Sequence, residues 1–188
     1  LGVGLLDAGF TVESSWPVNT ESEQSLHQAK KNAAASTIML ACRKRLDPDG
    51  DGGKVFFEDI EPEVRAAARE ATTRFEDAGI GGVDLLLASY GPALSVLSRH
   101  WPVYSSETDE LGGSRRLRPE EALEVAREEV ARLRRLALVG HPVDFDPVTD
   151  FVLIAWDIFR AEEFPYDEAR HLALALGGGD VESLAAAK

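Results

Sequence analysis

The first 46 residues carry the pattern that most limits what this chain can fold into. Residues 1–9 have the composition of the end of a helix closed by a glycine. β-Branched and aromatic residues predict a strand over residues 10–16, stopped by Pro17. The apolar run 36–42 is typical of a second strand that is covered on both faces, in a sheet of more than two strands. Because a lone strand pair is only marginally stable, we expect the chain to begin partway through a larger fold.

A change in composition separates this opening segment from the rest. Residues 19–35 are polar, and the part from 26 to 34 is compatible with a helix. Residues 47–53 contain only aspartate, proline and glycine, which is turn chemistry. We therefore divide the chain into an opening segment with two strands (1–46), a turn or linker (47–60) and a helical C-terminal region (61–188).

The C-terminal region has the apolar spacing of successive amphipathic helices. In the clearest of them Ala122, Ala126 and Val130 share one face, and Gly140 ends the helix. The pattern predicts a loop or hairpin at 101–117. Helices are expected at 61–78, in two short pieces from a cap at Asp84 with a break at Gly91-Pro92, at 119–138, at 167–176 and after 179. A further helix is expected to start at Asp146-Pro147, with an apolar stripe from Phe151 to Phe159, although residues 151–156 taken alone are also compatible with a strand. The expected class is α+β, mainly α.

The acidic charge of the chain is unevenly distributed. The formal net charge is −13, yet residues 1–46 carry five basic and four acidic side chains, which leaves −14 for the remainder. Because proteins bind nucleic acid by neutralising its phosphates with Lys and Arg, the acidic remainder is a poor candidate for a broad DNA-binding face. Any phosphate contact is expected in the first segment.

Composition also indicates the cellular setting. No apolar run approaches the roughly 20 residues of a membrane helix, and the first residues lack the order of a signal peptide. Cys42 is the single cysteine, which excludes a disulfide or a cysteine zinc site within this chain. A cytoplasmic location is expected.

One segment matches a metal-binding motif. Asp47, Asp49, Asp51 and Glu58 stand at positions one, three, five and twelve of a calcium loop, with Gly52 at position six. The surroundings differ from such a loop, because an apolar strand precedes the first aspartate. The competing interpretation is a solvated hairpin or linker turn. No residue has the spacing of a catalytic group, so we expect no catalytic residue.

The opening segment resembles the end of the catalytic domain in the predicted adenine-specific DNA methylases, a group that often carries a zinc ribbon and occurs in anti-phage gene clusters. The resemblance lies in Ala8-Gly9-Phe10, Trp16-Pro17-Val18, Thr20-Glu21 and Ala35-Ser36, then in residues 38–42 followed by Arg43-Lys44-Arg45. It continues in Tyr90-Gly91-Pro92-Ala93-Leu94, Ser98-Arg99, Pro119-Glu120-Glu121-Ala122-Leu123 and Pro165-Tyr166-Asp167-Glu168-Ala169.

The resemblance implies a Rossmann-like sheet, S-adenosylmethionine as methyl donor and the N6 amine of a flipped-out adenine as acceptor. It makes residues 1–46 the remnant of the catalytic domain, with the terminal strand pair of the methyltransferase sheet. The Asn/Asp-Pro-Pro-Tyr motif of such enzymes is missing, because the chain contains no Pro-Pro pair. We therefore expect no cofactor-binding residue in this chain and S-adenosylmethionine in the full-length enzyme only.

Two functional expectations follow for this chain. Lys30, Lys31 and Asn32 are candidates for contact with DNA phosphate in the full-length enzyme, and the competing interpretation is an exposed polar connection. The alternative to a methyltransferase C-terminal part is an acidic helical module that binds a partner protein or regulates an enzyme.

Overall fold

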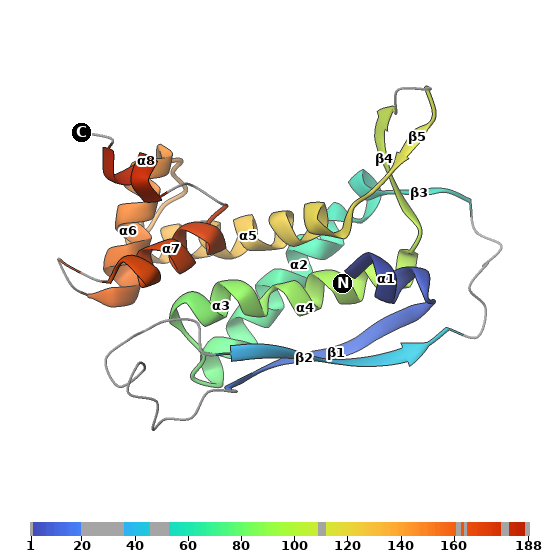
Figure 1. The fold of residues 1–188 in the computed structure, drawn as a ribbon, viewed down its shortest axis with the longest axis horizontal. Coiled ribbons are helices and arrows are strands. Elements are labelled where there is room, and N and C mark those ends of the chain that lie inside the picture. Colours follow the sequence, from blue (N-terminus) through green and yellow to red (C-terminus); the bar gives the residue numbers. More distant parts are fainter. Residues whose placement is uncertain are drawn as a thin grey trace.

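The structure, a computed structural model, describes residues 2–19, 36–45, 53–108, 112–160, 163, 165–177 and 181–186. The helices are α1 (Gly2–Asp7), α2 (Phe57–Asp77), α3 (Gly82–Ala88), α4 (Tyr90–His100), α5 (Pro119–Val139), α6 (Pro147–Phe159), α7 (Tyr166–Ala175) and α8 (Val181–Ala186). The strands are β1 (Phe10–Asn19), β2 (Ser36–Lys44), β3 (Val55–Phe56), β4 (Val103–Thr108) and β5 (Ser114–Arg116). The expected α+β class, mainly α, is confirmed (Figure 1).

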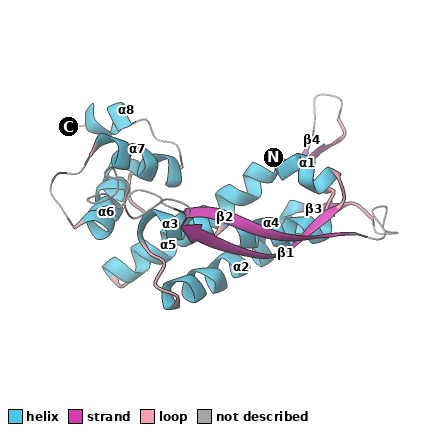
Figure 2. Cartoon of the chain, turned by 60° about the horizontal axis from the view of Figure 1, so that its bottom comes forward, coloured by secondary structure: helices cyan, strands magenta, loops and turns pink. Residues whose placement is uncertain are grey.

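Strands β1 and β2 form an antiparallel ribbon that lies along α3 and α4 (Figures 1 and 2). The register shifts between Val12 and Ser14, where β1 has an extra residue. The prediction that Pro17 stops the strand is wrong, because β1 continues to Asn19 with Pro17 opposite Ile38. A proline is tolerated there because β1 is an edge strand.

The second predicted strand is confirmed, but its expected burial on both faces is not found. Among the described strands β2 pairs only with β1. The side chain of Met39 is 58% exposed, and Cys42 is exposed as well. The apolar sequence of β2 therefore predicts more burial than the two-stranded ribbon gives this strand.

Helices α2, α4 and α5 form the body of the molecule. One buried cluster contains Leu6, Val64 and Ala126, and a second contains Phe75 and Val130. Both α2 and α5 contribute to each cluster, so these two long helices join the two parts of the core.

Three boundaries differ from the predictions. Helix α2 begins at Phe57, before the expected start, because Phe57 and Ile60 are buried and extend its packing face. Asp84 does not cap α3, whose N-cap residue is Gly81. The break between the two short helices falls at Ser89, and Gly91 lies in the first turn of α4.

Most of the remaining elements agree with the sequence patterns. Strands β4 and β5 form the expected hairpin. Strand β3, parallel to β4, lies in the range expected to be a turn or linker. Helix α5 ends at Gly140 with a φ of 81°, and the Asp146 carboxylate caps α6. Helices α6, α7 and α8 gather at one end of the molecule (Figure 1). No helix in the described ranges is long and apolar enough to cross a membrane.

Candidate functional site

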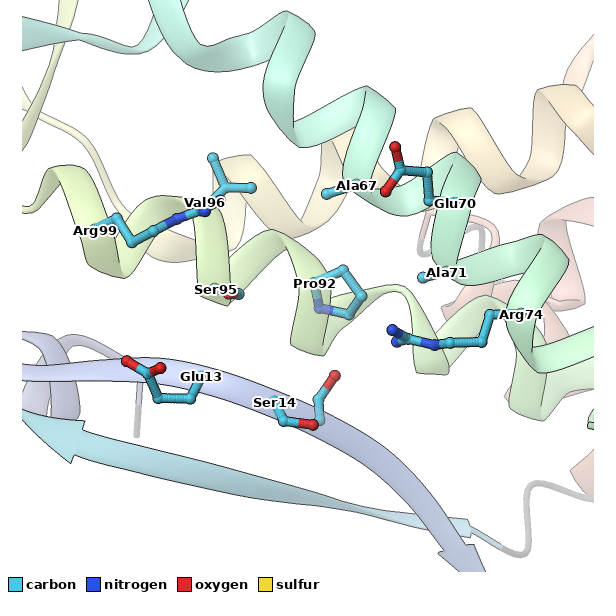
Figure 3. A pocket seen from close by; sticks show the side chains of 11 residues that line it. Glu13, Ser14, Ala67, Glu70, Ala71, Arg74, Pro92, Ser95, Val96 and Arg99 are labelled. Carbon is cyan, nitrogen blue, oxygen red and sulfur yellow. The ribbon is translucent and has the colours of Figure 1, made fainter.

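A groove of about 170 Å³ lies between β1 and the helices α2 and α4, as Figure 3 shows. Its polar lining comes from all three elements: Glu13, Ser14 and Ser15 from β1, Glu70 and Arg74 from α2, and Ser95 and Arg99 from α4. The groove thus brings both signs of charge together beside the bulge in β1.

Serines of α4 hold β1 in place along this groove. The hydroxyl of Ser98 accepts a hydrogen bond from the Val12 N–H at 2.9 Å, and the Ser95 hydroxyl donates to the Val12 carbonyl oxygen at 2.7 Å. These bonds engage backbone groups of Val12, the residue directly before the register shift of β1. Neither serine is predicted as a site residue; their i, i+3 spacing on α4 and the place of Ser98 in the family resemblance are the signals that the sequence offers for them.

A second contact of the same two elements is steric. The close approach of Gly91 to the Ser15 side chain brings the first turn of α4 against β1. The helix break and the family resemblance at Gly91 do not predict this close approach to Ser15.

The charges of the groove are partly engaged. Arg99 forms an ion pair with Glu63 at 2.7 Å, and the Arg74 guanidinium lies 4.8 Å from the centre of the Phe75 ring. The described lining contains no histidine or cysteine. The arrangement is therefore suited to holding polar groups of either charge, and it lacks the paired nucleophile and base of a hydrolytic site.

The groove does not fit S-adenosylmethionine. Pockets that enclose ligands of this size have volumes of about 300–1,000 Å³, whereas this groove has about 170 Å³. No glycine-rich turn follows a strand among the residues that line it. We therefore derive no step of methyl transfer from these residues.

The two outer edges of the ribbon differ in how they are protected from pairing with another strand. The outer edge of β1 has the bulge, Pro17 and the contact of α4 with Val12. The register of β2 is regular where it faces β1, and residues 37–42 contain neither proline nor charge. Free edges in natural proteins are usually blunted by bulges, prolines or charges. The β1 edge has such protection and the central part of the β2 edge has none.

The structure describes one of the predicted site residues. Lys30, Lys31 and Asn32 lie outside the described residues, as do Asp47, Asp49 and Asp51. Glu58 lies in the first turn of α2, where its carboxylate accepts hydrogen bonds from the Ser106 hydroxyl at 2.6 Å and the Ser106 N–H at 3.1 Å. These bonds, the hydroxyl bond foremost, lower the pKa of Glu58.

Glu58 therefore fastens the β4–β5 hairpin to α2. Within the described ranges no group of three or more His, Cys, Asp or Glu residues is placed to hold a metal ion. Of the four predicted calcium ligands, the structure describes Glu58 alone, so the calcium-loop interpretation stays a prediction.

Comparison of the chain with protein-family models, with curated proteins and with solved structures finds no match.

Proposed function

We propose that this chain is the C-terminal part of an S-adenosylmethionine-dependent, adenine-specific (N6) DNA methyltransferase of an anti-phage or restriction-type system. In this proposal β1 and β2 are the terminal strands of a Rossmann-like sheet, and the helical region is an extension of the enzyme. The catalytic and cofactor-binding residues belong to other parts of the full-length protein. By itself the chain has no methyltransferase activity.

The open edge of β2 is the observation that carries the proposal. A strand with the uncharged run 37–42, exposed at Met39 and Cys42, is a ready template for pairing with another chain. The neighbouring β1 edge is protected, so the asymmetry points to a further strand beside β2 and none beside β1. A sheet continued on the β2 side supplies the burial that the apolar sequence of β2 predicts.

The reading frame that encodes the chain provides the first test. An Asp-Pro-Pro-Tyr type motif and a Phe-x-Gly-x-Gly turn upstream of Leu1 would support the family assignment. A complete frame without them would contradict it.

Calorimetry with S-adenosylmethionine tests the division of roles. We expect no saturable heat with the chain alone and binding with the full-length protein. Binding by the chain alone at a dissociation constant on the order of micromolar, about −8 kcal/mol, would show that it holds a cofactor site of its own.

The DNA contact is a further part of the proposal. Lys30, Lys31 and Asn32 lie in the connection between β1 and β2. The double substitution Lys30→Ala/Lys31→Ala in the full-length enzyme should weaken DNA binding and reduce its dependence on salt. The matched variant Arg43→Ala/Lys44→Ala, at the opposite end of the ribbon, should leave both unchanged. Equal effects of the two variants would show that Lys30 and Lys31 have no special role in DNA binding.

A further inference from the structure

Helix α6 has two inward carboxylates that pair with α5 and two exposed apolar residues on its outer side. Asp157 pairs with Arg134 of α5 at 3.1 Å, and Asp150 pairs with Arg135 at 2.8 Å. The Asp157 side chain is only 8% exposed. On the outside, Val152 is 59% exposed and Trp156 is 50% exposed.

An ordinary surface helix places its charges in water and its apolar residues in the core, whereas α6 also exposes two large apolar residues, Val152 and Trp156. These two residues stand one turn apart, so their side chains share one face. Partly exposed Val148 precedes them by one turn. We call Val148, Val152 and Trp156 the outer stripe of α6.

The inner face of α6 is already occupied. Ile154 and Ala155 are buried in the second core cluster, with Phe151, Ile158 and Phe159 packed against it. The outer stripe is therefore a separate apolar surface. Contiguous exposed apolar side chains of this kind mark interaction sites in soluble proteins, and tryptophan is a preferred anchor at interfaces.

The charge of the C-terminal part of the chain indicates the partner of the outer stripe. Residues 141–188 contain ten acidic and three basic side chains. Asp144 and the α6 cap Asp146, which precede the stripe along the chain, are exposed. Arg160, the basic residue at the C-terminal end of α6, is paired with Asp157, and the inward carboxylates Asp150 and Asp157 pair with α5. Pairing with a second copy would bring two such surfaces together in a chain of net charge −13, and like charges oppose that.

We propose that the outer stripe of α6 docks an amphipathic helix of another protein, whose apolar face packs on Val152 and Trp156 and whose flanks carry Lys or Arg. Helical spacing of the anchors suits packing of one helix on another. The proposal rests on the surface of α6 and does not depend on the methyltransferase assignment.

The test uses the chain with fluorescent amphipathic peptides of roughly 18 residues, long enough to form a helix on the surface. One peptide has leucines at helical spacing and lysines elsewhere, and its match has glutamate in place of lysine. Fluorescence anisotropy measures the affinity of each for the parent, for Val152→Ser/Trp156→Ser and for the control Leu174→Ser. Leu174 is an equally exposed apolar residue on α7. Circular dichroism verifies that all three proteins are folded.

We expect saturable binding of the lysine peptide, weakened by at least about tenfold, or 1.4 kcal/mol, in the double variant and unchanged in Leu174→Ser. The glutamate peptide should bind the parent at least about tenfold more weakly. Absent binding, equal affinity of both peptides, or equal affinity for the double variant would overturn the proposal. Sedimentation that shows a dimer of the chain, lost in the double variant, would make a second copy the occupant and would also overturn it.

Discussion

A Cβ atom on Gly91 would overlap both the Cβ and the Oγ of Ser15. The ribbon and α4 are therefore so close at Gly91 that a residue with a side chain would clash there. Gly91 has no positive φ, so a glycine is required here by the close approach to Ser15 and not by the backbone conformation.

Gly91→Ala should destabilise the chain by about 1–3 kcal/mol, because the added methyl group overpacks the contact with Ser15. The intrinsic helix preference of alanine acts in the opposite direction, by about 1 kcal/mol. Urea unfolding measures the net change. Gly4→Ala is the control, because a Cβ at Gly4 in α1 would meet no atom within 4 Å. Equal stability of Gly91→Ala and the parent would show that the ribbon moves away from α4 without cost.

Ser98→Ala should cost about 1–3 kcal/mol, because it leaves the buried Val12 N–H without its acceptor. Ser98 itself is 0% exposed, so water cannot replace the hydroxyl without rearrangement. Thr73→Ala is the matched control, because the Thr73 hydroxyl donates only to a carbonyl oxygen in its own helix. A loss in Ser98→Ala no larger than that in the control would contradict the role assigned to Ser98.

Acid should weaken the attachment of the β4–β5 hairpin. The Arg115 guanidinium, bonded to both carboxylate oxygens of Glu121, lowers the pKa of Glu121 from 4.5 to about 2. A depressed carboxylate pKa adds stability that is fully present above the unfolded value and disappears as pH falls through the folded value. The pair should therefore lose about 1–3 kcal/mol between pH 4.5 and 2, a range that allows for solvent screening.

Thermal unfolding as a function of pH checks this expectation. Glu121→Gln should flatten the decline below pH 4.5, while Glu120→Gln, in the same turn but exposed, should retain it. Parallel curves for the parent and Glu121→Gln would rule out the pair as the source of acid sensitivity.

Glu129 joins α5 to α2 through a nearly buried carboxylate. Its side chain is 3% exposed and bonds to Arg132 at 2.7 Å and to Arg69 at 3.0 Å. The Arg132 bond is the main cause of the lowered pKa of Glu129. Glu129→Gln should destabilise the chain by about 1–3 kcal/mol, less than for a fully buried pair because both arginines reach solvent.

Chemical denaturation of Glu129→Gln and of the exposed neighbour variant Glu128→Gln separates this effect from a general loss of charge. Glu128 is 57% exposed, and its substitution should change stability by less than about 0.5 kcal/mol. Equal losses of stability in the two variants would show that the burial of Glu129 does not strengthen its ion pairs.

Local signals predicted most of the helices. The apolar spacing of α5 and Gly140 defined that helix closely, and the proline after Asp146 marked the start of α6. Elsewhere the tertiary structure overrode these local signals. Helix α2 begins before its expected start because Phe57 is buried, and β1 continues past Pro17 because it is an edge strand.

The candidate site was less predictable because it depends on contacts between distant parts of the chain. Ser95 and Ser98 reach Val12 across 83 and 86 residues, and no local pattern predicts these contacts. The inward position of the α6 carboxylates depends on Arg134 and Arg135, whose position relative to Asp150 and Asp157 no local pattern predicts. The apolar run of β2 predicted burial, but among the described strands β2 pairs only with β1.

Alkylation of Cys42 tests most directly the central claim that another strand covers the free edge of β2. Cys42 is exposed in this structure, on the strand whose edge is open. Mass spectrometry after treatment with a thiol reagent should find Cys42 modified rapidly in the chain alone and at least about tenfold more slowly in the folded product of the complete reading frame. Equal rates of Cys42 modification in the two proteins would contradict the claim.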